Sequence, residues 1–404
     1  MGAVRDLAER YFSGDEKTIH PFTPRLAVEE IAPRVAFASS FANVTAIDTD
    51  EGLVLVDTGS FVLAAPTKGL VRIFSQRALH TAIFTHGHVD HCFGVDLYEA
   101  EHGPARVVAH DAVNARFDRY LETRGYNSCI NARQFQTTAT WPTAFRRPDV
   151  TYARDMSLDV GGVRFELHHA RGETDDATWV WLPHERVLCT GDLFIWATPN
   201  AGNPQKVQRF AIDWARALRA MLPLGADVLC PGHGPPIFGA EHVRAALDDT
   251  ASLLESLHAQ TLALMNEGAT LDRVLSEVRA PPHLLDRPYL RPIYDEPEFI
   301  VRNVWRLYGG WYDGNPAHLK PGADRALAAE IAALAGGTPK LVERAQTLSA
   351  RGEHALACHL AEMAHLASPS DRGIAKARVA IYRARADVET SLMAKGIFRS
   401  VGDE

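Results

Sequence analysis

From residue 34 onward, apolar and polar positions alternate in short runs that predict β-strands. Residues 34–41, 43–48 and 53–59 read RVAFASSF, NVTAID and LVLVDTG, with a turn at 48–52. Such runs bounded by turn residues are typical of strands. The same reasoning predicts further strands at 80–85, 106–109, 163–168, 178–182, 186–190 and 226–230, and helices at 63–79, 111–123 and 212–221. Because strands and helices interleave as far as about Phe238, the pattern predicts an α/β domain.

The pattern changes after residue 240. Residues 241–267 are rich in Ala and Leu at helical spacing, and residues 272–279 continue this spacing. From Asp324 to the end, apolar residues recur in successive helical segments separated by Gly, Pro and Ser, which predicts paired helices. A chain of 404 residues is too long for one ordinary core. We therefore predict two domains, residues 1–240 with α/β character and residues 241–404 with only helices.

Composition and charge exclude several classes of protein. With 46% hydrophobic and 23% charged residues, the chain has the balance of a soluble globular protein. A net charge of -8 leaves no basic excess for a nucleic-acid partner. No apolar run is long enough to span a membrane, and residues 1–21 lack the apolar core of a signal peptide. The five cysteines are scattered without CxxC spacing, so we expect reduced thiols in a cytoplasmic protein.

The segment Thr85-His86-Gly87-His88-Val89-Asp90-His91 carries three imidazoles and a carboxylate directly after a predicted buried strand. Imidazole and carboxylate are ligands that zinc prefers. Residues 86 and 88 can turn their rings to one side of a tight loop, while residues 90 and 91 can face a second ion. Chance rarely produces this density of ligands, so the segment predicts a metal site.

The HxHxDH pattern resembles the signature of the metallo-β-lactamase superfamily, which implies an αββα sandwich for residues 1–240. Three further segments support the resemblance. Leu55-Val56-Asp57-Thr58-Gly59 resembles the family's LVDTG segment, in which the Asp (here Asp57) supports a histidine ligand. Thr190-Gly191-Asp192-Leu193-Phe194 resembles the TGD-x-F segment, whose Asp (Asp192) bridges two metals. Pro231-Gly232-His233-Gly234 resembles the PGHG segment that supplies the last imidazole.

One position departs from the general pattern. Where the family has a histidine in a PGHT-like loop, this chain has Glu173. An oxygen ligand there is similar to the alkylsulfatase branch of the superfamily, and it makes the first metal site harder and more anionic. The alternative is that His168 or His169 supplies the ligand. Whether Asp175 or Asp176 touches a metal is left open.

The resemblance thus implies two metal ions, expected to be zinc, with Mn or Fe as alternatives. The first site takes His86, His88 and Glu173, and the second takes Asp90, His91 and His233. Asp192 lies between them. Two such ions would lower the pKa of a bound water from about 16 toward 7 and so provide hydroxide for hydrolysis. Asp90 and Asp192 are the expected catalytic residues, with Asp90 accepting a proton from the water.

The C-terminal region supports the alkylsulfatase branch. Residues 304–316, VWRLYGGWYDGNP, resemble a segment of the alkylsulfatase dimerisation domain, and the helices that follow also fit it. The resemblance implies a homodimer formed through residues 241–404. Without it, the aromatic residues would be taken as core packing, which is their commoner use.

Two segments are candidates for substrate contacts. After Asp192, alkylsulfatases carry Thr and Arg residues that grip the sulfate, but Asn203 and Gln205 stand near those places here. Asn200, Lys206 and Arg209 are then the candidate contacts, or Lys206 and Arg209 are ordinary surface cations. The second segment, residues 124–134, is dense in hydrogen-bond donors and offers Tyr126, Asn127, Asn131 and Arg133. Otherwise it is a loop that satisfies its own hydrogen bonds.

The expected function is hydrolysis of a small alkyl sulfate or related ester by a metal-bound hydroxide. Because the superfamily hosts many chemistries, a lactonase, another carboxylic or phosphoric ester hydrolase and a weak β-lactamase are alternatives on the same scaffold. An iron-dependent oxygenase ranks behind them. A mono-iron site needs only one set of ligands, whereas this chain offers two.

Overall fold

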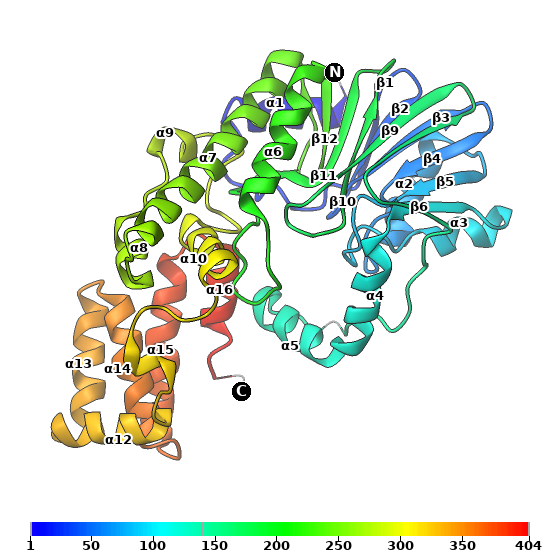
Figure 1. Ribbon diagram of the computed structural model, residues 1–404. Coiled ribbons are helices and arrows are strands. Elements are labelled where there is room, and N and C mark those ends of the chain that lie inside the picture. Colours follow the sequence, from blue (N-terminus) through cyan, green and yellow to red (C-terminus); the bar gives the residue numbers. More distant parts are fainter. Residues whose placement is uncertain (1, 139, 403–404) are drawn as a thin grey trace. The chain divides into compact units, whose positions relative to one another are not determined.

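Two β-sheets packed face to face form the centre of the first part of the chain (Figure 1). The computed structural model describes residues 2–138 and 140–402. The first sheet contains seven strands in chain order: β1 (Ala27–Ala32), β2 (Val35–Ser39), β3 (Val44–Thr49), β4 (Gly52–Val56), β5 (Leu79–Ile83), β6 (Arg106–His110) and β7 (Val150–Tyr152). Strands β1 to β4 are antiparallel, and β4 to β7 are parallel.

The second sheet has the order β13-β12-β11-β10-β9-β8. Its strands are β8 (Asp155–Val160), β9 (Val163–Ala170), β10 (Ala177–Leu182), β11 (Val187–Ile195), β12 (Val228–His233) and β13 (Ile237–Phe238). The β11–β12 pair is parallel, and the other pairs are antiparallel. One apolar core fills the space between the sheets, with Phe37 and Ile47 from the first and Phe165 and Val180 from the second fully buried.

Helices cover the outer face of each sheet. The first sheet packs against α2 (Ala64–Phe74) and α3 (Val95–His102), and the second packs against α6 (Ala211–Met221) and α7 (Ala240–Asn266). These helices bury one apolar stripe each; in α6 the stripe includes Trp214 and Leu218. The predicted αββα sandwich is therefore confirmed.

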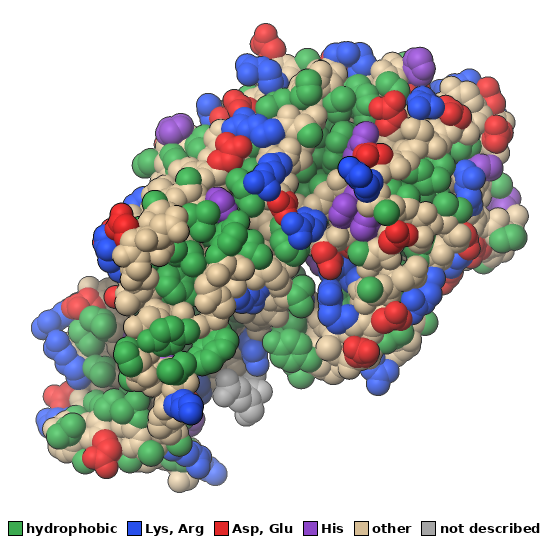
Figure 2. All heavy atoms as spheres, viewed as in Figure 1, with side chains coloured by type: hydrophobic (Ala, Val, Ile, Leu, Met, Phe, Trp, Pro, Cys, Tyr) green, Lys and Arg blue, Asp and Glu red, His purple; other side chains and the backbone are tan. Residues whose placement is uncertain are grey.

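The remaining helices of this part join or flank the sheets. They are α1 (Ala3–Phe12), α4 (Ala112–Glu122), the short η1 (Leu222–Leu224), α8 (Leu271–Glu277), α9 (Pro282–Leu285) and α10 (Pro297–Gly309). The first compact unit comprises residues 1–124, 142–268 and 274–308. On the face of this unit that Figure 2 shows, Lys and Arg side chains are interspersed with Asp and Glu.

The second compact unit comprises residues 125–141, 269–273 and 309–404 and is helical where the structure describes it. Its helices are α5 (Arg124–Phe135), α11 (Pro316–Leu319), α12 (Asp324–Leu334), α13 (Thr338–Ala350), α14 (His354–Ala367), α15 (Arg372–Val388) and α16 (Leu392–Arg399). One of its cores joins Leu348 of α13, Cys358 of α14 and Ile381 of α15. The predicted helical C-terminal region is confirmed, and the predicted boundary at residue 240 stays a prediction.

Several predicted elements have to be corrected. Residues 124–134 form helix α5 and not a loop, because Asn127, Ile130 and Gln134 are buried on one face at helical spacing; only one of the three is apolar, which hid the pattern. The helix predicted at 63–79 ends at Phe74. Strand β11 continues through Ile195, past the predicted end at residue 190. Several elements were not predicted, among them helices α1 and α3 and strands β1, β7, β8 and β13.

Among the described residues, no helix combines the length and apolarity that crossing a membrane requires.

Candidate metal centre

The predicted ligand residues come together at one edge of the sandwich. Asp57 follows β4, the segment 85–91 follows β5, and Glu173 follows β9. Strands β4 and β5 are parallel, and β9 runs in the same direction as β11 and β12 because two antiparallel pairings separate it from β11. The carboxyl ends of these strands therefore meet at the same edge, where Thr178 N donates to Thr85 O across the two sheets at 2.6 Å.

Asp57 anchors the histidine-rich segment. Its backbone has a φ of 60°, a conformation that Asp adopts more readily than most residues. Its Oδ1 accepts from Thr85 N at 2.7 Å, and its Oδ2 accepts from Thr85 Oγ1 at 2.8 Å. The same Oδ2 lies 2.8 Å from His91 Nδ1. This contact puts the proton of a neutral His91 on Nδ1 and leaves Nε2 as a ligand atom.

One group of ligand atoms joins Asp90, His91 and His233, all within 4.8 Å of one another. His91 Nε2 lies 3.8 Å from Asp90 Oδ2, and His233 Nε2 lies 3.4 Å from the same oxygen. His233 is oriented by Nδ1, which donates to Phe41 O at 2.6 Å. Both rings thus direct Nε2 toward the carboxylate of Asp90.

A second group joins His86, His88 and Asp192, again within 4.8 Å. His86 Nε2 lies 2.9 Å from His88 Nδ1 and 3.7 Å from Asp192 Oδ2. The other oxygen, Asp192 Oδ1, lies 3.4 Å from His91 Nε2 and 3.5 Å from His233 Nε2. One carboxylate therefore faces both groups, as a bridging ligand does.

Two glycines make room for Asp192. Gly191 precedes it with a φ of 50°, at an irregularity in the pairing of β11 with β12, and a Cβ atom there would lie 2.5 Å from Thr85 Oγ1. A Cβ atom on Gly232 would lie 2.0 Å from Asp192 Oδ1. Neither position has space for a side chain, so both glycines serve a close backbone approach.

Glu173 lies beside the group of His86, His88 and Asp192. Its Oε1 is 3.8 Å from His88 Nδ1, 2.6 Å from Arg209 Nη1 and 2.6 Å from Asn200 Nδ2. Its Oε2 is buried and has no hydrogen-bond partner among the residues that the structure describes. Arg209 and Asn200 thus hold the side chain through Oε1, and Oε2 is a buried acceptor.

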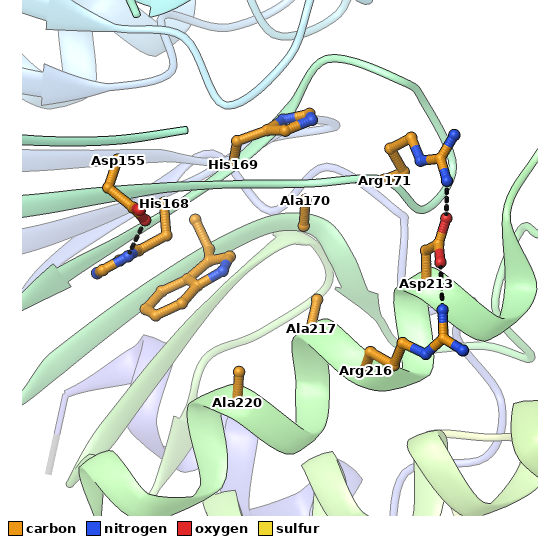
Figure 3. A pocket seen from close by; sticks show the side chains of 10 residues that line it. Asp155, His168, His169, Ala170, Arg171, Asp213, Arg216, Ala217 and Ala220 are labelled. Atoms are coloured by element: carbon orange, nitrogen blue, oxygen red, sulfur yellow. Dashed lines mark hydrogen bonds and ion pairs between the residues drawn. The ribbon is translucent and has the colours of Figure 1, made fainter. Parts of the chain in front are cut away.

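The two alternative ligands have other partners. His168 Nδ1 lies 2.7 Å from Asp155 Oδ1, and its ring stacks on Trp179 at 4.0 Å. It lines a hollow of about 480 Å³ between β9 and α6. His169 stacks on His110 at 3.7 Å, and Figure 3 shows it on the opposite side of β9 from His168. These contacts support Glu173 over either histidine.

The pKa values of the cluster show how much charge it buries. Burial lowers the pKa of His91, but Asp192, Asp57 and Asp90 outweigh this and raise it to about 9. Burial raises the pKa of Glu173 to about 8, against the lowering effect of Arg209. Burial also lowers the pKa of His86 to about 4. The carboxylates around His91 thus favour positive charge at this point, and a bound cation would supply it.

The donor set fits two divalent cations. The groups offer imidazole nitrogen and carboxylate oxygen, which suit zinc and also iron or manganese. Within the described part of the chain, His91 Nε2, Glu173 Oε2 and Asp192 Oδ1 are buried without a hydrogen-bond partner. Buried polar atoms without partners are costly, and bound metal would satisfy all three.

Asp175 and Asp176 both form ion pairs with the side chain of Arg116. Asp176 Oδ2 accepts from Gly87 N at 3.0 Å and from Arg116 Nε at 2.7 Å, and Asp175 also pairs with Arg116. Arg116 is buried on the face of α4 that carries Phe117. This support of the ligand loop was not predicted from the sequence, although a charged residue at a core position of a helix could have indicated it.

The candidate substrate residues fall into two sets. Asn200 and Arg209 are buried and contact Glu173, so Arg209 is not a surface cation. Burial and Arg209 lower the pKa of Lys206 to about 8, while Glu173 and Asp90 oppose this. The other set, Tyr126, Asn127, Asn131 and Arg133, lies on α5. Residues 125–135 of this helix belong to the second compact unit. Tyr126 is exposed and Asn127 is buried.

Two further side chains escaped the sequence analysis. Asn43 donates to Pro231 O at 3.0 Å and to Gly234 O at 2.8 Å, so it holds the loop that carries His233. Tyr294 packs on Phe22 at 5.3 Å, and Phe22 in turn packs on His233 at 5.1 Å. No local motif marks either residue, because each is brought to the site by contacts distant in sequence.

Comparison with known proteins extends these observations. Residues 39–233 match the model of the metallo-beta-lactamase superfamily, and residues 270–404 match that of alkyl sulfatase dimerisation. A linear primary-alkylsulfatase from Pseudomonas sp. (strain ATCC 19151) is 28% identical over 340 residues, covering 78% of this chain and 64% of that protein. The chain thus spans less than two thirds of that relative.

Two more similarities differ in kind. The stereoselective inverting sec-alkylsulfatase Pisa1 from Pseudomonas sp. has the same fold, with a TM-score of 0.84, 22% identity, and coverage of 93% of this chain and 64% of that chain. The alpha subunit of a 2,4-dinitroanisole O-demethylase from Nocardioides sp. (strain JS1661) is 24% identical over 309 residues. That match covers 72% of this chain and 83% of the subunit.

Proposed function

Since the chain combines a metallo-beta-lactamase superfamily domain with an alkyl sulfatase dimerisation domain, we propose that it is a dinuclear metal-dependent hydrolase of alkyl sulfates or related esters. The single observation that supports this best is the position of Asp192, whose two oxygens face two separate groups of ligand atoms. Zinc is the metal we propose. The cytoplasmic location stays a prediction.

The chain's own residues would bind and orient the reactants. Two divalent ions, when bound, supply Lewis acidity and lower the pKa of water. We assign His86, His88 and Glu173 to the first ion, Asp90, His91 and His233 to the second, and Asp192 to both. Asp90 would bind the second ion through Oδ2, which lies 3.4 Å from His233 Nε2, and would take up a proton on its other oxygen. Asp57 keeps His91 in the tautomer that binds metal.

The substrate class rests on weaker support than the metal centre. A relative whose match covers 78% of the chain is a linear primary-alkylsulfatase, but residues 203 and 205 are Asn and Gln in this chain. Lys206 is the nearby cation we propose for an anionic substrate, because the guanidinium of Arg209 already pairs with Glu173. Tyr126, Asn127, Asn131 and Arg133 remain predicted substrate contacts.

A second candidate is cleavage of an aryl methyl ether. The supporting observation is length: the match to the O-demethylase subunit covers 83% of that protein, whereas the match to the alkylsulfatase covers 64%. The absence of Thr and Arg at residues 203 and 205 also fits a substrate without sulfate.

A substrate panel with metal analysis tests both candidates. The purified protein is assayed for bound metal and for turnover of p-nitrophenyl sulfate, dodecyl sulfate, a lactone, nitrocefin and 2,4-dinitroanisole. We expect two metal ions per chain and sulfate release. Asp192→Asn should lose both, whereas the control Asp213→Asn, which removes a carboxylate that pairs with Arg171 and Arg216, should keep them. Turnover of 2,4-dinitroanisole without sulfate release would reject the sulfatase assignment.

We also propose a homodimer formed through the helical C-terminal region, because residues 270–404 match the dimerisation model. Sedimentation velocity measures the mass directly. A monomer at micromolar concentration would contradict this proposal without affecting the assignment of the metal centre.

A further inference from the structure

Two buried donors converge on one oxygen of Glu173. Arg209 Nη1 and Asn200 Nδ2 each lie 2.6 Å from Oε1. The Arg209 side chain is only 2% exposed, and that of Glu173 is 6% exposed. Arg209 Nη1 also donates to Asn200 O, so the three residues form a closed network. The opposite oxygen, Oε2, has no hydrogen-bond partner within the described residues.

The segment that carries both donors is itself fixed. Asn303 Nδ2, on α10, donates to Ala201 O at 2.7 Å and to Arg209 O at 3.1 Å, one contact near each donor residue. Between them, Asp295 Oδ2 accepts from Gly202 N at 2.6 Å and from Asn203 N at 3.2 Å. Both Asp295 and Asn303 are buried. The backbone that presents Asn200 and Arg209 therefore has little freedom to move.

We propose that Arg209 and Asn200 are positioning residues for Glu173: they hold Oε1 so that Oε2 is presented to the first metal ion. This inference rests on the proposed function, since it takes Glu173 as a ligand. A ligating carboxylate needs such outer partners to fix its orientation. It also changes the role predicted from sequence, in which Asn200 and Arg209 contact the substrate.

The geometry favours positioning over direct recognition of a substrate anion. A sulfate group would have to displace Glu173 from a guanidinium that is 98% shielded from solvent, since only 2% of its side chain is exposed. Removing one partner of a buried ion pair leaves the other charge uncompensated, which is strongly unfavourable. Lys206, in contrast, is only partly buried.

Charge and orientation predict opposite results, which makes the inference testable. The positive charge of Arg209 repels a cation bound at Glu173, so its removal by itself would tighten metal binding. Loss of orientation would weaken it. Outer partners of metal ligands typically contribute 10–100-fold in metal affinity. We therefore expect Arg209→Met to weaken binding of one of the two ions by about 10–100-fold and to leave the other ion, held by Asp90, His91 and His233, unchanged.

The experiment is a zinc titration of the 404-residue chain after chelation, measured by calorimetry. The visible spectrum of the cobalt-loaded protein is an independent readout of each site. Arg209→Lys retains one donor and should give an intermediate loss. Asn200→Ala removes a donor without changing charge and should weaken the same ion. Arg378→Met is the matched control, since Arg378 is 10% exposed and pairs with Glu362 at 2.8 Å; it should bind two ions as the parent protein does.

The outcomes separate the two proposals. Two ions bound with parental or tighter affinity in both Arg209→Met and Asn200→Ala would overturn the positioning role while the metal centre stands. If Arg209→Met does not fold, Arg209→Lys and Asn200→Ala decide in the same way. By contrast, a parent protein that binds fewer than two ions, or a Glu173→Gln variant that binds both ions normally, would refute the assignment of Glu173 and with it the proposed centre.

Discussion

Replacing Asp57 by Asn changes one atom of the carboxylate and tests whether the tautomer of His91 controls the second metal site. Asn tolerates the φ of 60° at this position. In the parent protein Thr85 N donates to Asp57 Oδ1 at 2.7 Å, and the Oδ1 of Asn can accept the same hydrogen bond. The amide NH₂ then replaces Oδ2, which lies 2.8 Å from both Thr85 Oγ1 and His91 Nδ1. An NH₂ group cannot accept a proton from His91.

The size of the effect follows from this exchange. His91 Nδ1 must accept from the amide, so the proton of the neutral ring moves to Nε2, the atom 3.4 Å from Asp192 and 3.8 Å from Asp90. A protonated nitrogen cannot bind a metal ion. Substitution of such an outer partner typically costs 10–100-fold in metal affinity, or about 1.4–2.7 kcal/mol. The loss should fall on the ion bound by Asp90, His91 and His233.

Zinc titration of the chelator-treated variant measures this loss, and histidine nitrogen chemical shifts report the tautomer. Asp249→Asn is the control, because Asp249 accepts from Tyr289 at 2.6 Å and pairs with Arg287 without touching a proposed ligand. Parental affinity for both ions in Asp57→Asn would refute the reasoning, as would weaker binding with His91 still protonated on Nδ1.

Three further predictions follow from buried groups. Burial raises the pKa of Asp295 from 3.8 to about 6 in the folded protein, so the folded state keeps a proton that the unfolded state releases. The free energy of unfolding therefore falls between about pH 4 and pH 6, by at most about 3 kcal/mol. Urea unfolding at both pH values should show a smaller fall in Asp295→Asn than in the parent protein. An equal fall in both proteins would contradict the shift. Gly232→Ala should displace Asp192 and reduce the amount of bound metal, because the new Cβ would lie 2.0 Å from Asp192 Oδ1. The control Gly69→Ala, with no atom within 4 Å of the new Cβ, should keep both ions and add about 0.5–1 kcal/mol of stability. Normal metal content in Gly232→Ala would be inconsistent with the bridging role of Asp192. Zinc at 100 times its dissociation constant should stabilise the chelated protein by about 2.7 kcal/mol, seen as a higher melting temperature, and an unchanged melting temperature would count against a metal centre.

Sequence patterns predicted the sandwich well where strands are wholly buried. Residues 53–56 and 180–182 are apolar throughout and lie in β4 and β10. The edge strand β8 was missed because half of its residues are exposed polar groups and only Leu158 and Val160 face the core. Helix α5 was missed for the opposite reason: its buried face carries Asn127 and Gln134, so hydrophobic periodicity was absent although helical packing was present.

The ligands could be predicted because each stands in a short segment with its own pattern. Their supports could not, because they depend on contacts between distant parts of the chain. Asn43 reaches the His233 loop across about 190 residues of sequence, and Asn303 fixes the backbone at Arg209 across 94. The sequence therefore indicated Arg209 as a cation near the site, but its pairing with Glu173 became evident only from the fold.

The charge of the proposed centre accounts for how an acidic chain could take an anionic substrate. The ligand set holds three carboxylates, Asp90, Glu173 and Asp192, with four imidazoles that are neutral when they bind metal. Two divalent ions would balance these three carboxylates and the one hydroxide that hydrolysis needs, and Arg209 adds one positive charge beside Glu173. Such charges act strongly over a few ångströms in a buried site, whereas the net charge of -8 is spread over the whole chain and screened by salt. Positive charge beside the proposed centre therefore supports a sulfate ester over a neutral ether as the proposed substrate.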